Sequence, residues 1–292
     1  MNLGREAKGY IWVAPMTIVL LLTTLVPVVY ILGLGFFENY LPTGRVIWAG
    51  LANYRETLSD PLFYKVLGNT AVYVIFSVLL HLAIGLFLAV FLDKRNRFAV
   101  LSSGLRVVFI IPWLLSWSVA SSIWLLILNP SGVLNSILIG LGLLEDKVAW
   151  FGSPDFAMVW IILITAWKAF PFYMMLIYAA LTTIPEELYE SASIDGANLV
   201  QKFYYVSFQS ILPTMLTLGV LDIIWSIRQY DIFALTTGGG PLDSTRTLSL
   251  HVYSTAFENL RFGLASSQGI MIMLISSLIS VFYIRLYSRA EG

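Results

Sequence analysis

Two groups of residues in this sequence have side chains that could do chemistry, and the first lies inside an apolar run. Four polar or aromatic residues recur at helical spacing in it: Asp222, Trp225, Ser226 and Gln229. Residues three, four and seven positions apart share one face of a helix. That face presents a carboxylate, an indole ring, a hydroxyl and an amide, which are the groups that a polyhydroxyl solute needs. Arg228 points away from it.

A second ionisable residue, Lys168, lies at a similar depth in another apolar run. Charged side chains inside a membrane are rare, and they face the interior of a helix bundle or a water-filled cavity. Two interpretations of Lys168 and Asp222 carry equal weight. Both residues line a substrate path, or they form an ion pair that only joins two helices.

Tryptophans in the third apolar run form a further candidate. Trp113, Trp117 and Trp124 follow one another at intervals that predict a single narrow stripe on a continuous helix. Trp113 and Trp124 suit the membrane interface, whereas Trp117 lies deeper. Aromatic faces suit the apolar faces of sugar rings, so Trp117 is a candidate for the path, although its position favours helix packing.

The second group lies in a polar stretch, residues 183–208, between two apolar runs. Asp195-Gly196 predicts the end of a helix, because glycine accepts the left-handed conformation. Capping-box patterns precede and follow this point, at Thr183 with Glu186 and at Asn198 with Gln201. We therefore expect two short helices that meet at a negatively charged glycine turn, called the knuckle below (residues 183–202).

Six apolar runs must position both groups of residues. They cover about residues 11–36, 68–92, 105–128, 156–180, 209–236 and 265–287. Each exceeds the roughly 20 residues that cross a bilayer, and backbone amides in lipid must bond within their own helix. The predicted fold class is all-α: a polytopic membrane protein with one transmembrane domain over residues 1–292. The first run is longer than the apolar part of a signal peptide, so we expect a span that is retained.

Composition supports this class and excludes others. The chain is 58% hydrophobic and 12% charged, with 17 basic and 17 acidic residues, whereas soluble domains carry about 25% charged residues. A net charge of zero gives no indication of a nucleic-acid partner. The sequence has no cysteine and two widely separated histidines, which argues against a metal centre or a disulfide framework.

Basic residues in short loops indicate the orientation. The densest cluster lies in the loop over residues 93–106, with Lys94, Arg95, Arg97 and Arg106. We expect this loop on the cytoplasmic side. Alternation of six spans then places both termini and the knuckle inside, and residues 129–155 outside.

The knuckle resembles a known motif. Residues 190–197 read Glu-Ser-Ala-Ser-Ile-Asp-Gly-Ala and resemble the EAA-x-x-DGA motif of binding-protein-dependent ABC transporter permeases. The chain departs from the pattern at Ser191, where alanine is usual, and at Phe208-Gln209, where Leu-Pro is usual. Weaker similarities occur in the family's order at residues 50–54, 167–172 and 237–241, and the last of these is typical of sugar-type, maltose-permease-like members.

This resemblance implies a fold, a function and partners. It implies the type I ABC importer permease fold, with six helices and both termini inside, in a bacterial or archaeal cell membrane. The function is that of a permease subunit for a sugar or related polyhydroxyl solute. The motif residues that would dock into a cleft on an ATPase subunit are Glu190, Ala192, Asp195, Gly196 and Ala197.

The implied partners are an extracytoplasmic solute-binding protein, two ATPase subunits and a second permease subunit. The second permease is expected to be a homologue, with a homodimer as the alternative. No cofactor is expected in this chain, because ATP and Mg²⁺ would bind to the ATPase subunits.

Other interpretations account for less of the sequence. An ion-coupled secondary transporter is the main alternative, but such proteins often show inverted repeats and the knuckle would have no role. A surface-lying helix pair would also leave the motif unexplained. An intramembrane enzyme lacks support in any catalytic motif. Gly238 to Gly240 favour a tight turn over a phosphate-binding loop, because no Gly-Lys-Ser/Thr follows them.

Overall fold

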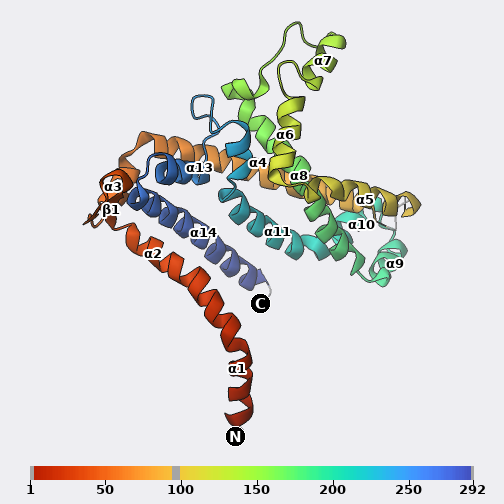
Figure 1. Ribbon diagram of the computed structural model, residues 1–292. Coiled ribbons are helices and arrows are strands. Elements are labelled where there is room, and N and C mark those ends of the chain that lie inside the picture. Colours follow the sequence, from red (N-terminus) through yellow and green to blue (C-terminus); the bar gives the residue numbers. More distant parts are fainter. Residues whose placement is uncertain (1–2, 94–98, 291–292) are drawn as a thin grey trace. The chain divides into compact units, whose positions relative to one another are not determined.

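Helices make up nearly all of the regular structure in the computed structural model, which describes residues 3–93 and 99–290 (Figure 1). Lys94, Arg95 and Arg97 of the basic loop lie outside the described residues, and the predicted orientation stays a prediction. The chain divides into two units. One comprises residues 1–64 and 251–278, and the other comprises residues 65–250 and 279–292.

The first unit begins with one long apolar helix. It consists of α1 (Leu3–Leu20), a π-helical turn η1 (Leu21–Leu25) and α2 (Val26–Leu34). A hairpin follows, in which β1 (Phe37–Tyr40) pairs antiparallel with β2 (Arg45–Trp48) across the turn η2 (Leu41–Thr43). Sequence analysis did not predict this hairpin, which lies between the first two apolar runs.

Side chains of α3 (Ala52–Ser59) hold the hairpin region together. The buried Asn53 amide donates to the carbonyls of Gly35 and Phe37, at 3.0 and 2.9 Å. Glu56 accepts two hydrogen bonds from the Arg261 guanidinium, and these bonds raise the pKa of Arg261. Arg261 lies between the π-helical turn η5 (Ser254–Glu258) and the last helix, α14 (Phe262–Ala290).

The second unit is built around α8 (Pro154–Thr182), which packs against α5 (Ala99–Leu114) and α11 (Gln209–Ile227). Buried apolar residues of α8 meet others from α11 and from α4 (Pro61–Phe91), and the centre of this core is formed by Ala89, Tyr173, Met174, Ile177, Ile211 and Leu218. A Cβ on Gly85 would lie 2.6 Å from that of Tyr173, so glycine lets the α4 backbone approach α8 closely.

Shorter elements connect the long helices of this unit. They are α6 (Trp117–Ile127), α7 (Val133–Gly140), η3 (Trp150–Gly152), α9 (Glu186–Ile194), α10 (Leu199–Lys202), the π-helical η4 (Phe203–Phe208) and α12 (Asp231–Thr236). Residues 248–250 of α13 (Leu248–Tyr253) also belong to this unit, and the rest of α13 belongs to the first. In Figure 1, α7 lies near the start of α8 and α9 lies beyond its end.

The candidate spans overlap the six predicted runs, with corrections at the second, third and fifth, and the second begins at Pro61 instead of about residue 68. Within the described ranges, five helices are long and apolar enough to cross a membrane: Trp12–Leu34, Pro61–Phe91, Pro154–Thr182, Leu199–Ile227 and Phe262–Val281. The third predicted run is a bent pair of helices, Val107–Leu114 with Trp117–Ile127 at 99°, which makes a sixth candidate span if the two helices are counted together. The fifth span begins ten residues before its predicted start and ends at Ile227, with α12 as a separate helix.

The bend in the third span has a local cause. Pro112 lies inside α5, where a proline removes a backbone hydrogen bond and disturbs the preceding turn. Ser116 then starts α6 by accepting a hydrogen bond from the Val119 amide at 3.2 Å. The predicted stripe of Trp113, Trp117 and Trp124 is therefore wrong, because no continuous helix joins the three residues.

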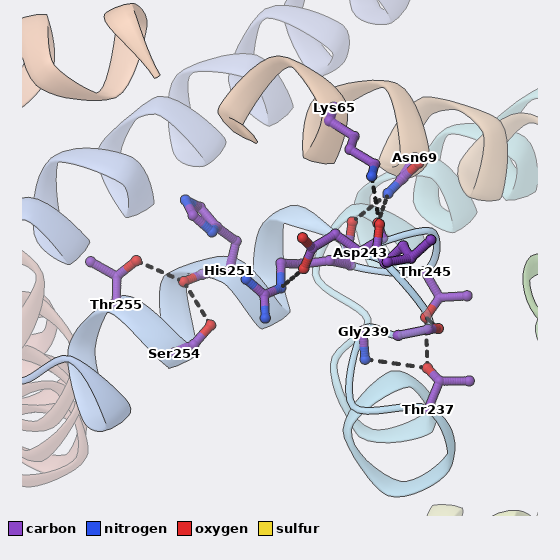
Figure 2. A network of polar contacts seen from close by, with 12 residues as sticks. Lys65, Asn69, Thr237, Gly239, Asp243, Thr245, His251, Ser254 and Thr255 are labelled. Carbon is purple, nitrogen blue, oxygen red and sulfur yellow. Dashed lines mark hydrogen bonds and ion pairs between the residues drawn. The ribbon is translucent and has the colours of Figure 1, made fainter. Parts of the chain in front are cut away.

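The loop after α12 folds as the tight turn that the sequence predicted. The amides of Gly238 and Gly240 donate to the carbonyls of Phe233 and Thr237, and the amide of Gly239 donates to the Thr237 hydroxyl. These amides are therefore engaged within the loop. The residues that follow the turn are bonded to α4. Lys65 and Asn69 donate to the carbonyls of Leu242 and Asp243, respectively (Figure 2).

Candidate functional site

A cavity of about 290 Å³ lies in the second unit, between α4, the bent span α5–α6, α8 and α11. All six residues that the sequence singled out for a substrate path line it: Trp117, Lys168, Asp222, Trp225, Ser226 and Gln229. They come from three different spans, so the shared location follows from tertiary packing and not from any one helix face.

Asp222 has a buried partner that sequence analysis did not assign. The Nδ1 atom of His81 lies 2.8 Å from Oδ2 of Asp222, and each residue is 3% exposed. Ser226, one turn further along α11, donates to the other carboxylate oxygen at 3.2 Å. Tyr173 stacks on the His81 ring, with centroids 5.4 Å apart. A buried carboxylate needs such partners, because its desolvation is otherwise unfavourable.

Lys168 has partners of its own. It is 7% exposed, its Nζ donates to the Trp113 carbonyl at 3.3 Å, and it lies 4.8 Å from the centre of the Trp117 ring. The ion pair between Lys168 and Asp222 is therefore not formed in the described part of the chain. The bend in the third span explains this difference, because carbonyls at the end of α5 have no helical partner and accept from the ammonium group.

Aromatic rings form one wall of the cavity. Trp225 is 46% exposed and packs against Phe172, with centroids 5.6 Å apart. Phe172 also stacks on Trp113 at 6.0 Å. Trp124 has a different environment, since it packs against Trp160 and Trp167. Trp113 and Trp117 thus line the cavity from either side of the break, while Trp124 does not.

Sequence analysis missed six lining residues: Tyr73, His81, Thr165, Ala169, Phe172 and Tyr173. His81 and Asp222 are 141 residues apart in the chain, so no local spacing links them. One signal was present, however, because a histidine within an apolar span is itself unusual and marks a candidate functional residue. Tyr173 carried no comparable signal among the many aromatic residues, and Phe172 was noted only as part of the family-like segment 167–172.

The knuckle begins differently from its prediction. Helix α9 starts at Glu186 with Pro185 as its N-cap, and no side chain caps it. The hydroxyl of Thr183 donates backwards to the Ala180 carbonyl at 2.8 Å. The predicted Thr183–Glu186 capping box is therefore wrong, because the threonine hydroxyl is engaged by the end of α8.

The glycine turn itself is confirmed. Gly196 has φ +76°, and its amide donates to the Ser193 carbonyl while the Ala197 amide donates to the Ala192 carbonyl. This pair of bonds is the Schellman arrangement that ends a helix. The Asn198–Gln201 capping box is also present. The second helix is not short, however, because α10 continues through η4 into α11.

Polar and apolar side chains are both exposed on the knuckle. Glu190, Asp195 and Gly196 are exposed, and Ala192 and Ala197 are half-buried. Three large apolar residues are strongly exposed: Ile194 at 87%, Leu199 at 84% and Val200 at 74%. Underneath, the Tyr189 hydroxyl lies 2.9 Å from that of Ser207, which joins α9 to η4. Exposed apolar groups beside charged ones are typical of a protein–protein contact.

Known proteins resemble this chain over most of its length. Residues 81–291 match the family described as the binding-protein-dependent transport system inner membrane component. The sulfoquinovosyl glycerol transport system permease protein SmoG of Agrobacterium fabrum is 30% identical, over 98% of this chain and 92% of that protein. The trehalose/maltose transport system permease protein MalF of Thermococcus litoralis is 30% identical, over 96% and 94%.

A solved structure has the same fold. It is the crystal structure of a bacterial ABC transporter involved in the import of the acidic polysaccharide alginate. Its matching chain superimposes with a TM-score of 0.87 at 22% identity, over 99% of this chain and 97% of the other. The family match and the relatives lead to one conclusion: this chain belongs to the family of inner membrane components of binding-protein-dependent transport systems, and it is a multi-pass permease subunit of an ABC importer.

Proposed function

We propose that this permease subunit carries a sugar or a related polyhydroxyl solute through the cavity in its second unit. The observation that carries the proposal is the composition of the cavity wall. Aromatic rings from α8 and α11 lie beside a carboxylate, an ammonium group, a hydroxyl and an amide. Rings suit the apolar faces of a sugar, and the polar groups suit its hydroxyls.

Size and relationship support the same class of solute. The volume of about 290 Å³ is near the lower end of the range of small-molecule sites, about 300–1,000 Å³. The relatives' names refer to trehalose, maltose and sulfoquinovosyl glycerol, all of which carry several hydroxyl groups. An ion-coupled secondary transporter is not supported, because the family works with a binding protein.

We also propose partners for this subunit. We propose that the knuckle docks on an ATPase subunit through Glu190, Ala192, Asp195, Gly196 and Ala197. Two ATPase subunits would bind ATP and Mg²⁺, and this chain would catalyse no reaction of its own. A second permease, a homologue or another copy of this chain, would complete the path. An extracytoplasmic binding protein would deliver the solute, as the alginate importer crystallised with its loaded periplasmic protein suggests.

Transport by the assembled complex tests the proposal. The complex, purified through this chain and reconstituted in vesicles with its binding protein, is assayed for ATP-driven uptake of labelled trehalose, maltose, glucose, glycerol 3-phosphate and sorbitol. We expect uptake of at least one of them. We also expect Asp222→Asn, Trp225→Ala and Gln229→Ala to weaken uptake, while the loaded binding protein still stimulates ATP hydrolysis. Full transport with an unchanged substrate range in all three variants would rule out this cavity as the path.

A further inference from the structure

Two buried polar atoms of the cavity lining lack hydrogen-bond partners within the described residues. They are Nε2 of His81, on α4, and the side-chain nitrogen of Gln229, just beyond α11. Buried polar atoms in folded proteins are nearly always paired, and each unpaired atom is destabilising. Two such atoms on the wall of one cavity therefore indicate groups that a ligand completes.

The hydrogen bonds of His81 determine what its free nitrogen can do. Asp222 lies 2.8 Å from Nδ1 and also accepts from Ser226. A carboxylate accepts hydrogen bonds, so the imidazole proton is held on Nδ1. In the neutral ring, Nε2 then carries a lone pair and acts as an acceptor. The Gln229 nitrogen, by contrast, is a donor.

An acceptor and a donor on one wall are complementary to hydroxyl groups, since each hydroxyl both donates and accepts. The geometry points to His81 as a specificity-determining residue, whose Nε2 accepts a hydrogen bond from one hydroxyl of the solute. Asp222 is its positioning residue, because it fixes the tautomer and the ring orientation. This inference rests on the proposed function and adds to it, since it requires a solute with a hydroxyl at one defined position.

The stacking of Tyr173 on His81 makes a sharp variant available. Phenylalanine at position 81 keeps a planar ring against Tyr173 but removes both nitrogens. For the sugar that the wild-type complex transports, uptake is measured with the sugar and with its full set of monodeoxy analogues. We expect His81→Phe to raise the KM of the parent sugar about tenfold. In the wild type, each analogue that lacks a bound hydroxyl should have a higher KM than the parent sugar. We expect His81→Phe to abolish this difference in KM for one analogue and to leave it for the others.

Loss of discrimination at a single hydroxyl separates binding from structure. A merely structural role for His81 would change all analogues alike. Asp222→Leu removes the acceptor that fixes the ring of His81 and should weaken discrimination at the same hydroxyl, because neither the tautomer nor the orientation of the imidazole is then held. Ser77→Ala is the matched control. It removes a buried hydroxyl one turn earlier on α4, at a residue that does not line the cavity, and should leave every preference unchanged.

The outcomes separate this inference from the proposed function. If the wild-type complex takes up sugars and His81→Phe keeps the wild-type preference among analogues, the role of His81 is wrong and the proposed function stands. Uptake of no member of the panel would overturn both. Should His81→Phe fail to co-purify with its partners, His81→Leu and Asp222→Leu carry the same test, and an unchanged preference in both would overturn the inference.

Discussion

The cavity and the knuckle present opposite kinds of groups to their surroundings. In the cavity, charged residues are buried among apolar helices, with Asp222 at 3% and Lys168 at 7% exposure. On the knuckle, large apolar residues are exposed, with Ile194 at 87% and Leu199 at 84%. Buried charges and exposed large apolar side chains are both energetically unfavourable, so they mark sites that have a function. The cavity is suited to a polar solute, and the knuckle is suited to a protein surface.

One helix belongs to both regions. The helical run α10–η4–α11 begins at Leu199 on the knuckle and ends at Ile227, just beyond the cavity residues Asp222 and Ser226. At 1.5 Å per residue its 29 residues span roughly 40 Å. A displacement of the knuckle would therefore reach the wall of the cavity along one continuous helical run, which includes the π-helical turn η4 and Pro213. Substitutions at either end of this helix, or between its ends, test whether the two regions are coupled.

The largest expected effect is at the glycine turn. Proline fixes φ near −65°, so Gly196→Pro cannot keep the observed φ of +76° and also loses the bond from the Gly196 amide to the Ser193 carbonyl. We expect ATP-driven uptake to fall to background while the spans remain inserted. Uptake and co-purification with the ATPase subunit are both measured, so that failed assembly is distinguished from failed coupling.

Asparagine at the same position is the matched control. A Cβ on Gly196 would meet no atom within 4 Å, and asparagine tolerates the left-handed conformation better than other residues with a side chain. Gly196→Asn should therefore retain most of the transport.

Glu190→Lys, at an exposed site, reverses a charge without disturbing the turn and should reduce uptake strongly. Wild-type transport by both Gly196→Pro and Glu190→Lys would exclude the knuckle as the coupling element.

What could be predicted from the sequence depends on the range of the interaction. The apolar runs, the glycine turn and the Asn198–Gln201 cap are set by neighbouring residues, and the structure has all of them. The partner of Asp222 is not, because His81 is brought to it by packing of α4 against α8 and α11. The α5–α6 bend depends on Pro112 and Ser116, which are local signals. It was not predicted, because the residues before and after them are apolar and form one uninterrupted run in the sequence.

The next largest effect concerns the charges in the cavity. If Lys168 and Asp222 formed an ion pair, exchanging them would restore function that each single change removes. The structure instead pairs Asp222 with His81 and Lys168 with the Trp113 carbonyl. We expect Lys168→Asp, Asp222→Lys and the double exchange each to lower uptake more than tenfold, with no rescue in the double variant. Rescue in a double-mutant cycle would restore the ion-pair interpretation.

A smaller effect is expected between the two regions. The hydroxyl of Tyr189 lies 2.9 Å from that of Ser207 and joins α9 to the helix that leads to the cavity. We expect Tyr189→Phe to lower the amount of solute transported per ATP hydrolysed by about threefold, as loosening of a partly buried hydrogen bond would. Tyr205→Phe, at a residue that is 69% exposed on the same helix, is the control and should leave this ratio unchanged. An equal change in both variants would show that the Tyr189–Ser207 contact has no special role.

The smallest effect concerns Trp117 and separates two roles of its ring, which are contact with the solute and packing between helices. Trp117 lies under the Lys168 ammonium at 4.8 Å from the ring centre and lines the cavity beside the break. A cation–π contact contributes about 0.5–1 kcal/mol at an exposed site, and more when it is desolvated, and tryptophan is the best partner for it. Trp117→Phe keeps an aromatic face, but it weakens this contact and replaces the indole with a smaller phenyl ring. We expect the KM for uptake to rise about twofold, whereas Trp117→Ala should raise it several-fold, because the face itself is lost. If Trp117→Phe and Trp117→Ala both transported as the wild type does, Trp117 would serve helix packing alone, and the aromatic wall of the path would consist of Trp225 and its neighbours on α8.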